Sequence, residues 1–197
     1  MAYDTRFVAS PARQSAMVSI HGFVVSSPTC GSTHVGVNYQ ELASGKYYEE
    51  LEPGQVFRHS ITRTVTETDN LLFTALTHNS AWLHLDDEYC KTQQFGRRLV
   101  NSNFTLSLVA GVGVSDITLG TTVANLGYND VKFSKPVFIG DTIYTETEVI
   151  SKRESKSRSD AGIVEFEIRG RNQSGDVVIS LRRTGLMIKK SSLQTKS

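Results

Sequence analysis

Residues 101–114, NSNFTLSLVAGVGV, decide the fold. Asn101, Ser102 and Asn103 carry side chains that can accept hydrogen bonds from the first free amides of a helix. The apolar side chains that follow cover nearly the whole circumference of such a helix: Phe104, Leu106, Leu108, Val109, Ala110 and Val112. A helix that is apolar on all sides needs other elements around it. The pattern therefore predicts a buried helix, and the rest of the chain must supply its surroundings.

The residues after this helix predict a sheet. Four ranges have strand patterns and are separated by turn residues: 121–133, 142–151, 161–170 and 177–188. In the second of them, Ile143, Thr145, Thr147 and Val149 alternate with Tyr144, Glu146 and Glu148. Strands that follow one another in this way favour an antiparallel meander. In the last strand the apolar phase shifts between Arg182 and Gly185, which predicts a β-bulge there.

The residues before the helix predict three shorter elements. The run 56–65 is rich in β-branched residues, which is typical of a strand. Thr66 and Asp69 have the spacing of a capping box, which predicts the start of a helix. The apolar stripe of that helix would be Leu71, Leu72, Ala75 and Leu76. A second short helical piece is expected at 86–92.

A buried helix along one face of a curved antiparallel sheet, with the other helices on that face, is an α+β arrangement. The hotdog fold is built in this way, so we expect a single hotdog fold: a curved antiparallel sheet wrapped around the buried central helix. Residues 46–190 would form this domain. Residues 1–45 show no sustained period and predict a loosely packed N-terminal extension, and residues 191–197 predict a C-terminal tail.

The composition limits the partners and the compartment. The 21 basic and 20 acidic residues are interleaved, so no nucleic-acid partner is expected. No apolar run approaches the roughly 20 residues that cross a bilayer, so no membrane partner is expected either. Neither Cys30 nor Cys90 belongs to a CxxC pair, which indicates reduced thiols. We expect a cytoplasmic protein; Arg6 and Arg13 among scattered serines leave the mitochondrial matrix as a minor alternative.

Residues 77–86, THNSAWLHLD, raise the question of a functional site. Two histidines, an asparagine, the only tryptophan and an acid lie here between two apolar segments. Taken alone, the pattern favours a capping or core role for His84, and it leaves Trp82 open between the core and a pocket wall. His78, His84 and Cys90 match no zinc-binding spacing, so we expect no metal.

Five stretches of the chain resemble the MaoC-like branch of the hotdog superfamily, the fold of R-specific enoyl-CoA hydratases. They are 69–73 (DNLLF), 83–86 (LHLD), 95–101 (FGRRLVN), 131–142 (VKFSKPVFIGDT) and 152–158 (KRESKSR). The resemblance covers residues 47–189. Residues 133–142 and the KRESKSR stretch look most like the subgroup that hydrates branched dicarboxylic acyl-CoA thioesters such as mesaconyl-CoA or itaconyl-CoA.

The resemblance implies a catalytic pair. In this family an Asp and a His five residues apart hold and activate the water. His84 matches the family's histidine, and Asn79 stands at the position of the acid; in an alternative register Thr77 takes that position. We therefore expect His84 to act as acid and base and Asn79 to position the water, with Thr77 and Asp86 as possible support. Asp86 could orient the imidazole, or it could be an exposed acid at a helix N-terminus.

The resemblance also implies where the thioester binds. Its oxygen should point at the backbone amides of Ser102 and Asn103, at the positive end of the buried helix. The family usually has glycine at the position of Ser102. The side chains that could contact the substrate or CoA are Trp82, Arg97, Arg98, Lys152 and Arg153. Pairing of these cations with nearby acids, or exposure on a solvated loop, is the alternative.

The expected function is that of a hydro-lyase. It would add or remove water across the double bond of a short branched dicarboxylic enoyl-CoA, with no cofactor beyond the CoA of its substrate. A non-catalytic acyl-CoA-binding hotdog subunit is one alternative, because the acid of the catalytic pair is missing. An acyl-CoA thioesterase is less favoured, because 101–115 contains no carboxylate. The resemblance also implies a homodimer or larger homo-oligomer, and such pairing would cover an edge strand.

Overall fold

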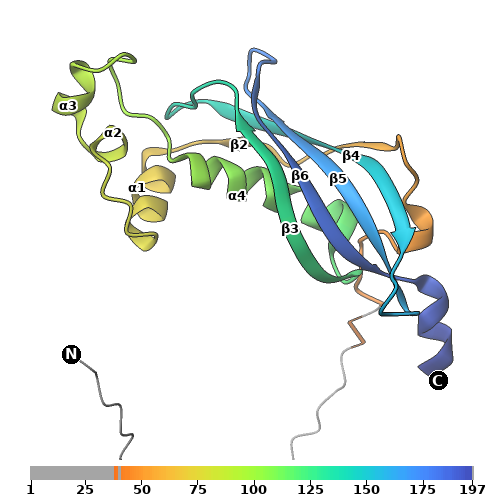
Figure 1. The fold of residues 1–197 in the computed structure, drawn as a ribbon. Helices are drawn as coiled ribbons and strands as arrows, with labels where there is room; N and C mark the ends of the chain where they lie inside the picture. The colour runs from red at the N-terminus through yellow and green to blue at the C-terminus, as the bar shows by residue number, and fades with distance from the viewer. Residues whose placement is uncertain (1–37, 40, 197) are drawn as a thin grey trace, which may run out of the picture. The chain divides into compact units, whose positions relative to one another are not determined.

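The computed structural model describes residues 38–39 and 41–196 (Figure 1). These described residues form one compact unit. Most of the predicted N-terminal extension, and with it Cys30, lies outside the described residues. At the other end, the predicted tail begins inside a short 3-10 helix, η3 (Lys190–Lys196). None of the helices in the described part of the chain is long and apolar enough to cross a membrane.

The four long strands predicted from the sequence are present. They are β3 (Thr122–Phe133), β4 (Thr142–Glu154), β5 (Ala161–Arg171) and β6 (Val177–Ile188). Strands β4, β5 and β6 form the expected antiparallel meander. Strand β3 does not continue it, because β3 pairs with β6 and lies at the edge of the sheet, whose order is β1-β4-β5-β6-β3.

A long connection explains why β3 and β4 are not neighbours. The chain leaves β3 and passes the start of the central helix, where the Val100 amide donates to the Val137 carbonyl over 2.9 Å. Leu99 and Phe138 form an isolated antiparallel bridge at the same place. These contacts hold the connection against residues before the helix, so it crosses over instead of closing a hairpin.

The predicted strand 56–65 is two strands instead of one. They are β1 (Val56–Arg58) and β2 (Arg63–Thr64), and both pair with β4. Between them the chain leaves the regular ladder at His59, whose amide still donates to the Thr145 carbonyl over 3.1 Å. The His59 side chain is buried there, and its hydrogen bonds hold the chain in this path.

The predicted bulge in β6 is also wrong. From Ile179 to Ile188, β6 keeps an unbroken register with β5. The register shift between β5 and β6 lies earlier, at Val178. The pair of β3 and β6 has three register shifts, and the extra residues are on β3. Every second residue of β6 therefore faces inward, and Leu186 and Ile188 lie on the other face. The apolar residues that suggested a phase change belong to two faces of one regular strand.

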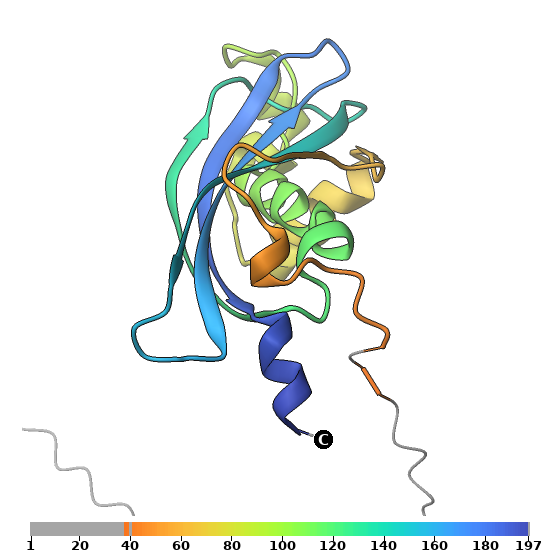
Figure 2. The ribbon, with the colours of Figure 1, turned by 90° about the vertical axis from the view of Figure 1, so that its right-hand side faces the viewer.

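The central helix is α4 (Ser102–Val112), with Asn101 as its N-cap, as predicted. Figure 2 shows α4 on the concave side of the curved sheet. The two are in close contact, because a Cβ at Gly170 of β5 would lie 2.7 Å from Val109 Cγ1. The expectation of burial on all sides is wrong for this single chain: Thr105, Val109 and Val112 are buried, but other residues of the helix reach solvent.

The core lies between α4 and the sheet. Its main cluster of buried residues is Val65, Val100, Val109, Val137, Ile143, Ile168, Val178, Ile179 and Leu181. The convex face of the sheet is charged instead, with Arg169 2.9 Å from Glu148 and Arg171 3.0 Å from Glu146. This distribution makes the concave side the place for a site.

Three short helices gather at the N-terminal end of α4 (Figure 1): α1 (Glu67–Leu76), α2 (Trp82–Leu85) and α3 (Asp87–Lys91). The capping box of Thr66 and Asp69 is confirmed. The predicted apolar stripe of α1 is not buried, and Leu76 is 72% exposed. The buried residues of this helix are Asn70 and Thr74, because their polar groups bond to neighbouring elements.

The two remaining short elements lie at the other end of the domain. They are η1 (Tyr48–Glu50) and the π-helical turn η2 (Val114–Thr118), which directly follows α4. The chain just before η1 packs on this turn, since the Gly45 and Lys46 amides donate to the Leu119 and Ile117 carbonyls over 3.0 and 2.7 Å. Residues 45 and 46 are therefore attached to the turn that follows α4.

Candidate active site

His84 lies on α2 and lines a pocket of about 480 Å³. The residue is only 7% exposed, and its Nδ1 lies 2.9 Å from the Leu99 carbonyl oxygen. A carbonyl oxygen can only accept, so Nδ1 is the donor in this bond. In the neutral ring Nε2 then keeps its lone pair. This arrangement leaves one imidazole nitrogen able to exchange a proton with a ligand in the pocket.

The pocket lies between α2, the start of α4 and the segment that follows β3. Most of its wall is apolar and includes Phe95, Leu99, Phe133 and Val178. Ser102, Thr105, Ser134 and Lys135 are the polar residues that line it together with His84. An apolar cavity with a few polar groups is the usual form of a small-molecule site.

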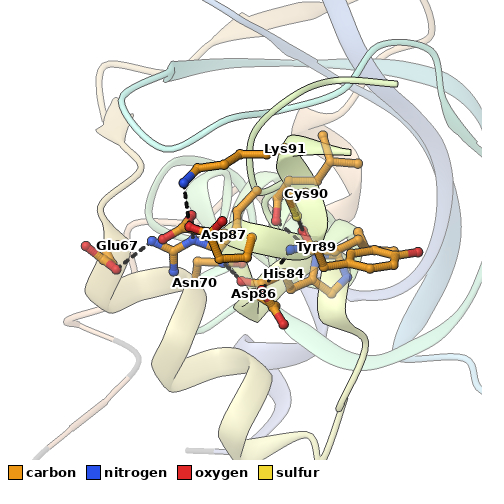
Figure 3. A network of polar contacts seen from close by, with 12 residues as sticks. Glu67, Asn70, His84, Asp86, Asp87, Tyr89, Cys90 and Lys91 are labelled. Atoms are coloured by element: carbon orange, nitrogen blue, oxygen red, sulfur yellow. Dashed lines mark hydrogen bonds and ion pairs between the residues drawn. The ribbon is translucent and has the colours of Figure 1, made fainter. Parts of the chain in front are cut away.

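Buried Asn70 fixes the position of His84 relative to α4 (Figure 3). Its Nδ2 donates to the His84 carbonyl over 2.9 Å, and its Oδ1 accepts from the Asn101 amide over 2.9 Å. The Asn101 side chain in turn donates to the Thr74 hydroxyl over 3.2 Å. One network therefore joins α1, α2 and the N-terminus of α4. The signal in the sequence was the pair of polar residues, Asn70 and Thr74, four apart in an apolar helix.

The helix N-terminus meets the pocket at Ser102. Of the two amides predicted to bind the thioester oxygen, that of Asn103 already donates to the Asn101 side chain over 3.0 Å. The Ser102 amide has no hydrogen-bond partner among the described residues, and Ser102 lines the pocket. Ser102 is thus the better placed of the two predicted donors.

Asn79 and Thr77 do not line the His84 pocket. The Asn79 side-chain oxygen accepts from the Ala81 amide over 3.1 Å, and Asn79 lines a second pocket of about 280 Å³ together with His78. The Thr77 hydroxyl donates to the Phe73 carbonyl of its own helix over 2.8 Å. Within one chain, the expected catalytic pair of Asn79 and His84 is therefore divided between two pockets.

Asp86 caps a helix and does not orient the imidazole. Its Oδ1 accepts from the Tyr89 amide at the start of α3 over 2.9 Å, while the imidazole donates to Leu99 (Figure 3). Trp82 is 65% exposed and makes an edge contact with the Tyr89 ring, so in this chain it belongs neither to the core nor to the pocket wall.

The predicted arginines are engaged elsewhere. The Arg98 guanidinium lies 2.7 Å from both Glu67 and Asp87 and ties α1 to α3 (Figure 3 labels both acids). The Arg97 guanidinium stacks on the Phe138 ring, 3.7 Å from its centroid. The alternative expected for Arg98 was pairing with nearby acids, and this is the arrangement found in the structure. Neither arginine lines the His84 pocket.

Lys152 and Arg153 lie far from the His84 pocket within the same chain. They stand near the end of β4, and Figures 1 and 2 show the β4–β5 hairpin at the end of the sheet opposite α2 and α3. Lys152 pairs with Glu52 at 2.6 Å. These residues therefore cannot contact a ligand beside His84 unless a second chain brings them there.

Lys135 was not predicted as a site residue, although it belongs to the pocket wall. Its Nζ lies 2.7 Å from Asp176 Oδ1, and this hydrogen bond lowers the pKa of the Asp176 carboxyl below its usual value. The signal was present in the sequence, because Lys135 lies in the FSKPV stretch that carries part of the family resemblance. Cys90 remains structural: burial raises the pKa of its thiol.

A second buried histidine, His59, lies at the other end of α4. Its Nδ1 is 2.8 Å from Asp116 Oδ2 and its Nε2 is 2.9 Å from Thr147 Oγ1. The hydrogen bond with His59 lowers the pKa of the Asp116 carboxyl. Gly113 leaves room for the ring, because a Cβ there would lie 3.0 Å from Nε2.

The curved sheet, its central helix and the histidine pocket define a hotdog-fold protein. A solved structure from Mycobacterium tuberculosis, described as having a double hotdog fold, superposes with a TM-score of 0.67 at 21% identity. The match covers 75% of this chain and 45% of that one. The predicted fold is thereby confirmed.

The chain belongs to the MaoC-like domain family, whose model matches residues 49–169, and the predicted resemblance is confirmed. It is 35% identical over 140 residues to the mesaconyl-CoA hydratase of Cereibacter sphaeroides, covering 71% of this chain and 40% of that protein. It is 31% identical over 114 residues to the (R)-specific enoyl-CoA hydratase of Aeromonas caviae, covering 55% and 78%. The chain thus spans about two fifths of the length of the first relative and most of the second.

Proposed function

We propose that this protein is a hydro-lyase that adds water to, or removes it from, the α,β double bond of an enoyl-CoA thioester. The observation that carries the proposal is the buried His84, whose Nδ1 is fixed on a backbone carbonyl and whose Nε2 is left for a pocket beside a helix N-terminus. The similarity to a protein named mesaconyl-CoA hydratase and to one named (R)-specific enoyl-CoA hydratase supports it.

The geometry suggests a division of roles. In the hydration direction, His84 Nε2 takes a proton from the attacking water, because an imidazole exchanges protons near neutral pH. The negative charge that develops on the thioester oxygen is stabilised by the Ser102 amide and the α4 dipole. The imidazolium then returns a proton to the α-carbon. We propose no cofactor beyond the CoA of the substrate.

We propose a short branched dicarboxylic acyl group for the substrate. The support is the similarity to a mesaconyl-CoA hydratase, together with the stretches 133–142 and 152–158 that resemble that subgroup. A short acyl group also agrees with a pocket of about 480 Å³.

One observation favours a second reading, an acyl-CoA-binding subunit without catalysis. No carboxylate lines the His84 pocket among the described residues, and Asn79, at the position of the family's acid, faces another pocket. An asparagine can orient a water but cannot take its proton. Both readings predict that the protein binds acyl-CoA thioesters, but only the hydro-lyase predicts turnover.

A spectroscopic assay separates them. The purified protein is mixed with mesaconyl-CoA, itaconyl-CoA or crotonyl-CoA, and loss of the enoyl-thioester absorbance is followed. Turnover is expected, fastest with a branched dicarboxylic substrate. In His84→Ala this turnover should be lost, whereas the matched control His78→Asn should keep it, because His78 is exposed and asparagine tolerates its φ of 52°. Binding of all three thioesters without turnover supports the non-catalytic subunit and rejects the hydro-lyase.

We further propose that a second copy of the chain pairs with this one along strand β3. Strand β3 is a twelve-residue edge strand with exposed apolar side chains, among them Leu126, Val131 and Phe133. Long apolar edges are normally covered. A second copy of the chain beside β3 would cover these exposed side chains.

Light scattering during gel filtration tests this assembly. A dimer is expected for the wild-type protein. Val131→Glu on β3 should shift it toward the monomer, whereas Val56→Glu, an exposed valine on the opposite edge strand β1, should not. A monomeric wild-type protein, or a dimer that resists Val131→Glu and dissociates with Val56→Glu, contradicts the proposed interface.

A further inference from the structure

The His84 pocket contains one permanent charge. Among the residues that line it, Lys135 is the only lysine or arginine, and no aspartate or glutamate is present. A carboxylate that enters an apolar pocket loses hydration and is stable there only when a cation or several donors compensate it. The pocket is therefore suited to an acyl group that carries one negative charge, provided that this charge reaches Lys135.

The backbone on both sides of Lys135 is fixed. The Ser134 amide donates to the Val178 carbonyl over 2.9 Å, and the Val137 carbonyl accepts from the Val100 amide over 2.9 Å. Lys135 thus stands on a segment held between β6 and the residue before the N-cap of α4. Its side chain is 53% exposed, whereas His84 is 7% exposed. The cation therefore lies on the solvent side of the pocket and the imidazole lies inside it.

Asp176 holds the Lys135 ammonium but accepts only part of its hydrogen-bonding capacity. The two groups are 2.7 Å apart, and Asp176 is itself held by its amide, which donates to the Asn172 side chain over 3.0 Å. The hydrogen bond from Lys135 lowers the pKa of the Asp176 carboxyl. An ammonium has three donors, so two remain for a second carboxylate.

The other basic residues near the pocket have different partners. Arg98 is bonded to two carboxylates and Arg97 lies on the Phe138 ring. Lys152 is paired with Glu52 at the far end of the sheet. Of these four basic side chains, Lys135 is the one that belongs to a residue lining the pocket.

We propose that Lys135 determines the substrate class by binding the second carboxylate of a dicarboxylic acyl-CoA while His84 acts on the double bond. The inference rests on the proposed function for its kinetic consequence. Its binding consequence, a preference for acyl groups with a second carboxylate, is independent of turnover.

The kinetic test compares mesaconyl-CoA with crotonyl-CoA, which has no second carboxylate. In Lys135→Met, kcat/KM for mesaconyl-CoA is expected to fall at least tenfold relative to that for crotonyl-CoA, and Lys135→Arg should recover part of it. Lys132→Met, an exposed lysine of β3 outside the pocket wall, is the matched control. An equal fall of kcat/KM with both substrates would mean that Lys135 contacts the CoA portion, and it would overturn the proposal. Wild-type kcat/KM values with both substrates in Lys135→Met would overturn it as well.

A binding test keeps this result separate from the proposed reaction. The saturated analogues methylsuccinyl-CoA and butyryl-CoA are titrated calorimetrically into the wild-type protein and the two variants. A preference for methylsuccinyl-CoA that disappears in Lys135→Met and persists in Lys132→Met supports the role of Lys135, even in a protein that turns over no enoyl-CoA. Absence of that preference in the wild-type protein, or its persistence in Lys135→Met, overturns the role of Lys135.

Discussion

The two ends of α4 each hold a buried histidine, and they differ in what the imidazole does. At the N-terminal end His84 uses Nδ1 for a backbone carbonyl and lines a pocket. At the C-terminal end His59 is equally buried, at 8% against 7% exposure, but both of its nitrogens are engaged by Asp116 and Thr147. The two histidines are thus equally buried, but they differ in hydrogen bonding. Both ring nitrogens of His59 have partners among the described residues, whereas only Nδ1 of His84 has one.

This difference separates a structural histidine from a catalytic candidate. The His59 ring, with both nitrogens hydrogen-bonded, joins three parts of the chain. They are the turn after α4, the segment between β1 and β2, and strand β4. A ring with one fixed nitrogen is held in orientation while the other can exchange a proton. The comparison predicts that changes at the two ends affect different measurements.

The largest effect is expected for His84→Gln. Glutamine keeps a donor for the Leu99 carbonyl but cannot take a proton, so kcat should fall about 10²- to 10⁴-fold, the usual contribution of general acid–base catalysis. The midpoint of urea unfolding should change little. Stopped assays of enoyl-CoA turnover give the rate, and circular dichroism gives the unfolding curve. A rate within threefold of wild type would remove His84 from the mechanism.

Asn70→Ala should affect both stability and rate. The variant leaves the His84 carbonyl and the Asn101 amide without a partner, and two unpaired buried groups cost about 2 to 6 kcal/mol in the free energy of unfolding. The rate per folded molecule should also fall, because α2 and α4 are no longer held together. Urea titration measures the first and turnover the second. Thr68→Ala, an exposed position on the same helix, is the control.

The smallest effect is expected for His59→Leu. Its buried partner Thr147 loses a hydrogen bond, so the free energy of unfolding should fall by about 1 to 3 kcal/mol. Turnover per folded molecule should stay at the wild-type level. Chemical denaturation and turnover at a temperature where the variant is fully folded check both parts. Lost turnover in the folded variant would mean that the C-terminal end of α4 also takes part in the reaction.

The local features of the fold could be predicted from the sequence. The apolar run 101–114 predicts α4, the Thr66–Asp69 spacing predicts the start of α1, and alternation predicts the long strands. These signals are local, because a helix or strand period depends on neighbouring residues. The pairing of β3 with β6 is not local. It follows from contacts of the β3–β4 connection with Leu99 and Val100, which no period reveals.

The site was predictable only in part for the same reason. His84 and Ser102 belong to local motifs, and both line the pocket. The separation of Asn79 from His84 depends on how α2 is oriented, and that orientation is set by Asn70, fourteen residues before His84. The sequence also could not show that Arg98 is taken up by Glu67, thirty-one residues away.

Chemical rescue tests the central role of His84 most directly. In His84→Ala, enoyl-CoA turnover is measured with and without added imidazole, and thioester binding is confirmed by calorimetry. The account predicts that turnover is lost without imidazole and partly returns as the concentration of imidazole rises, because a free ring can occupy the vacated space and accept the proton. Turnover of His84→Ala at the wild-type rate without imidazole would contradict it.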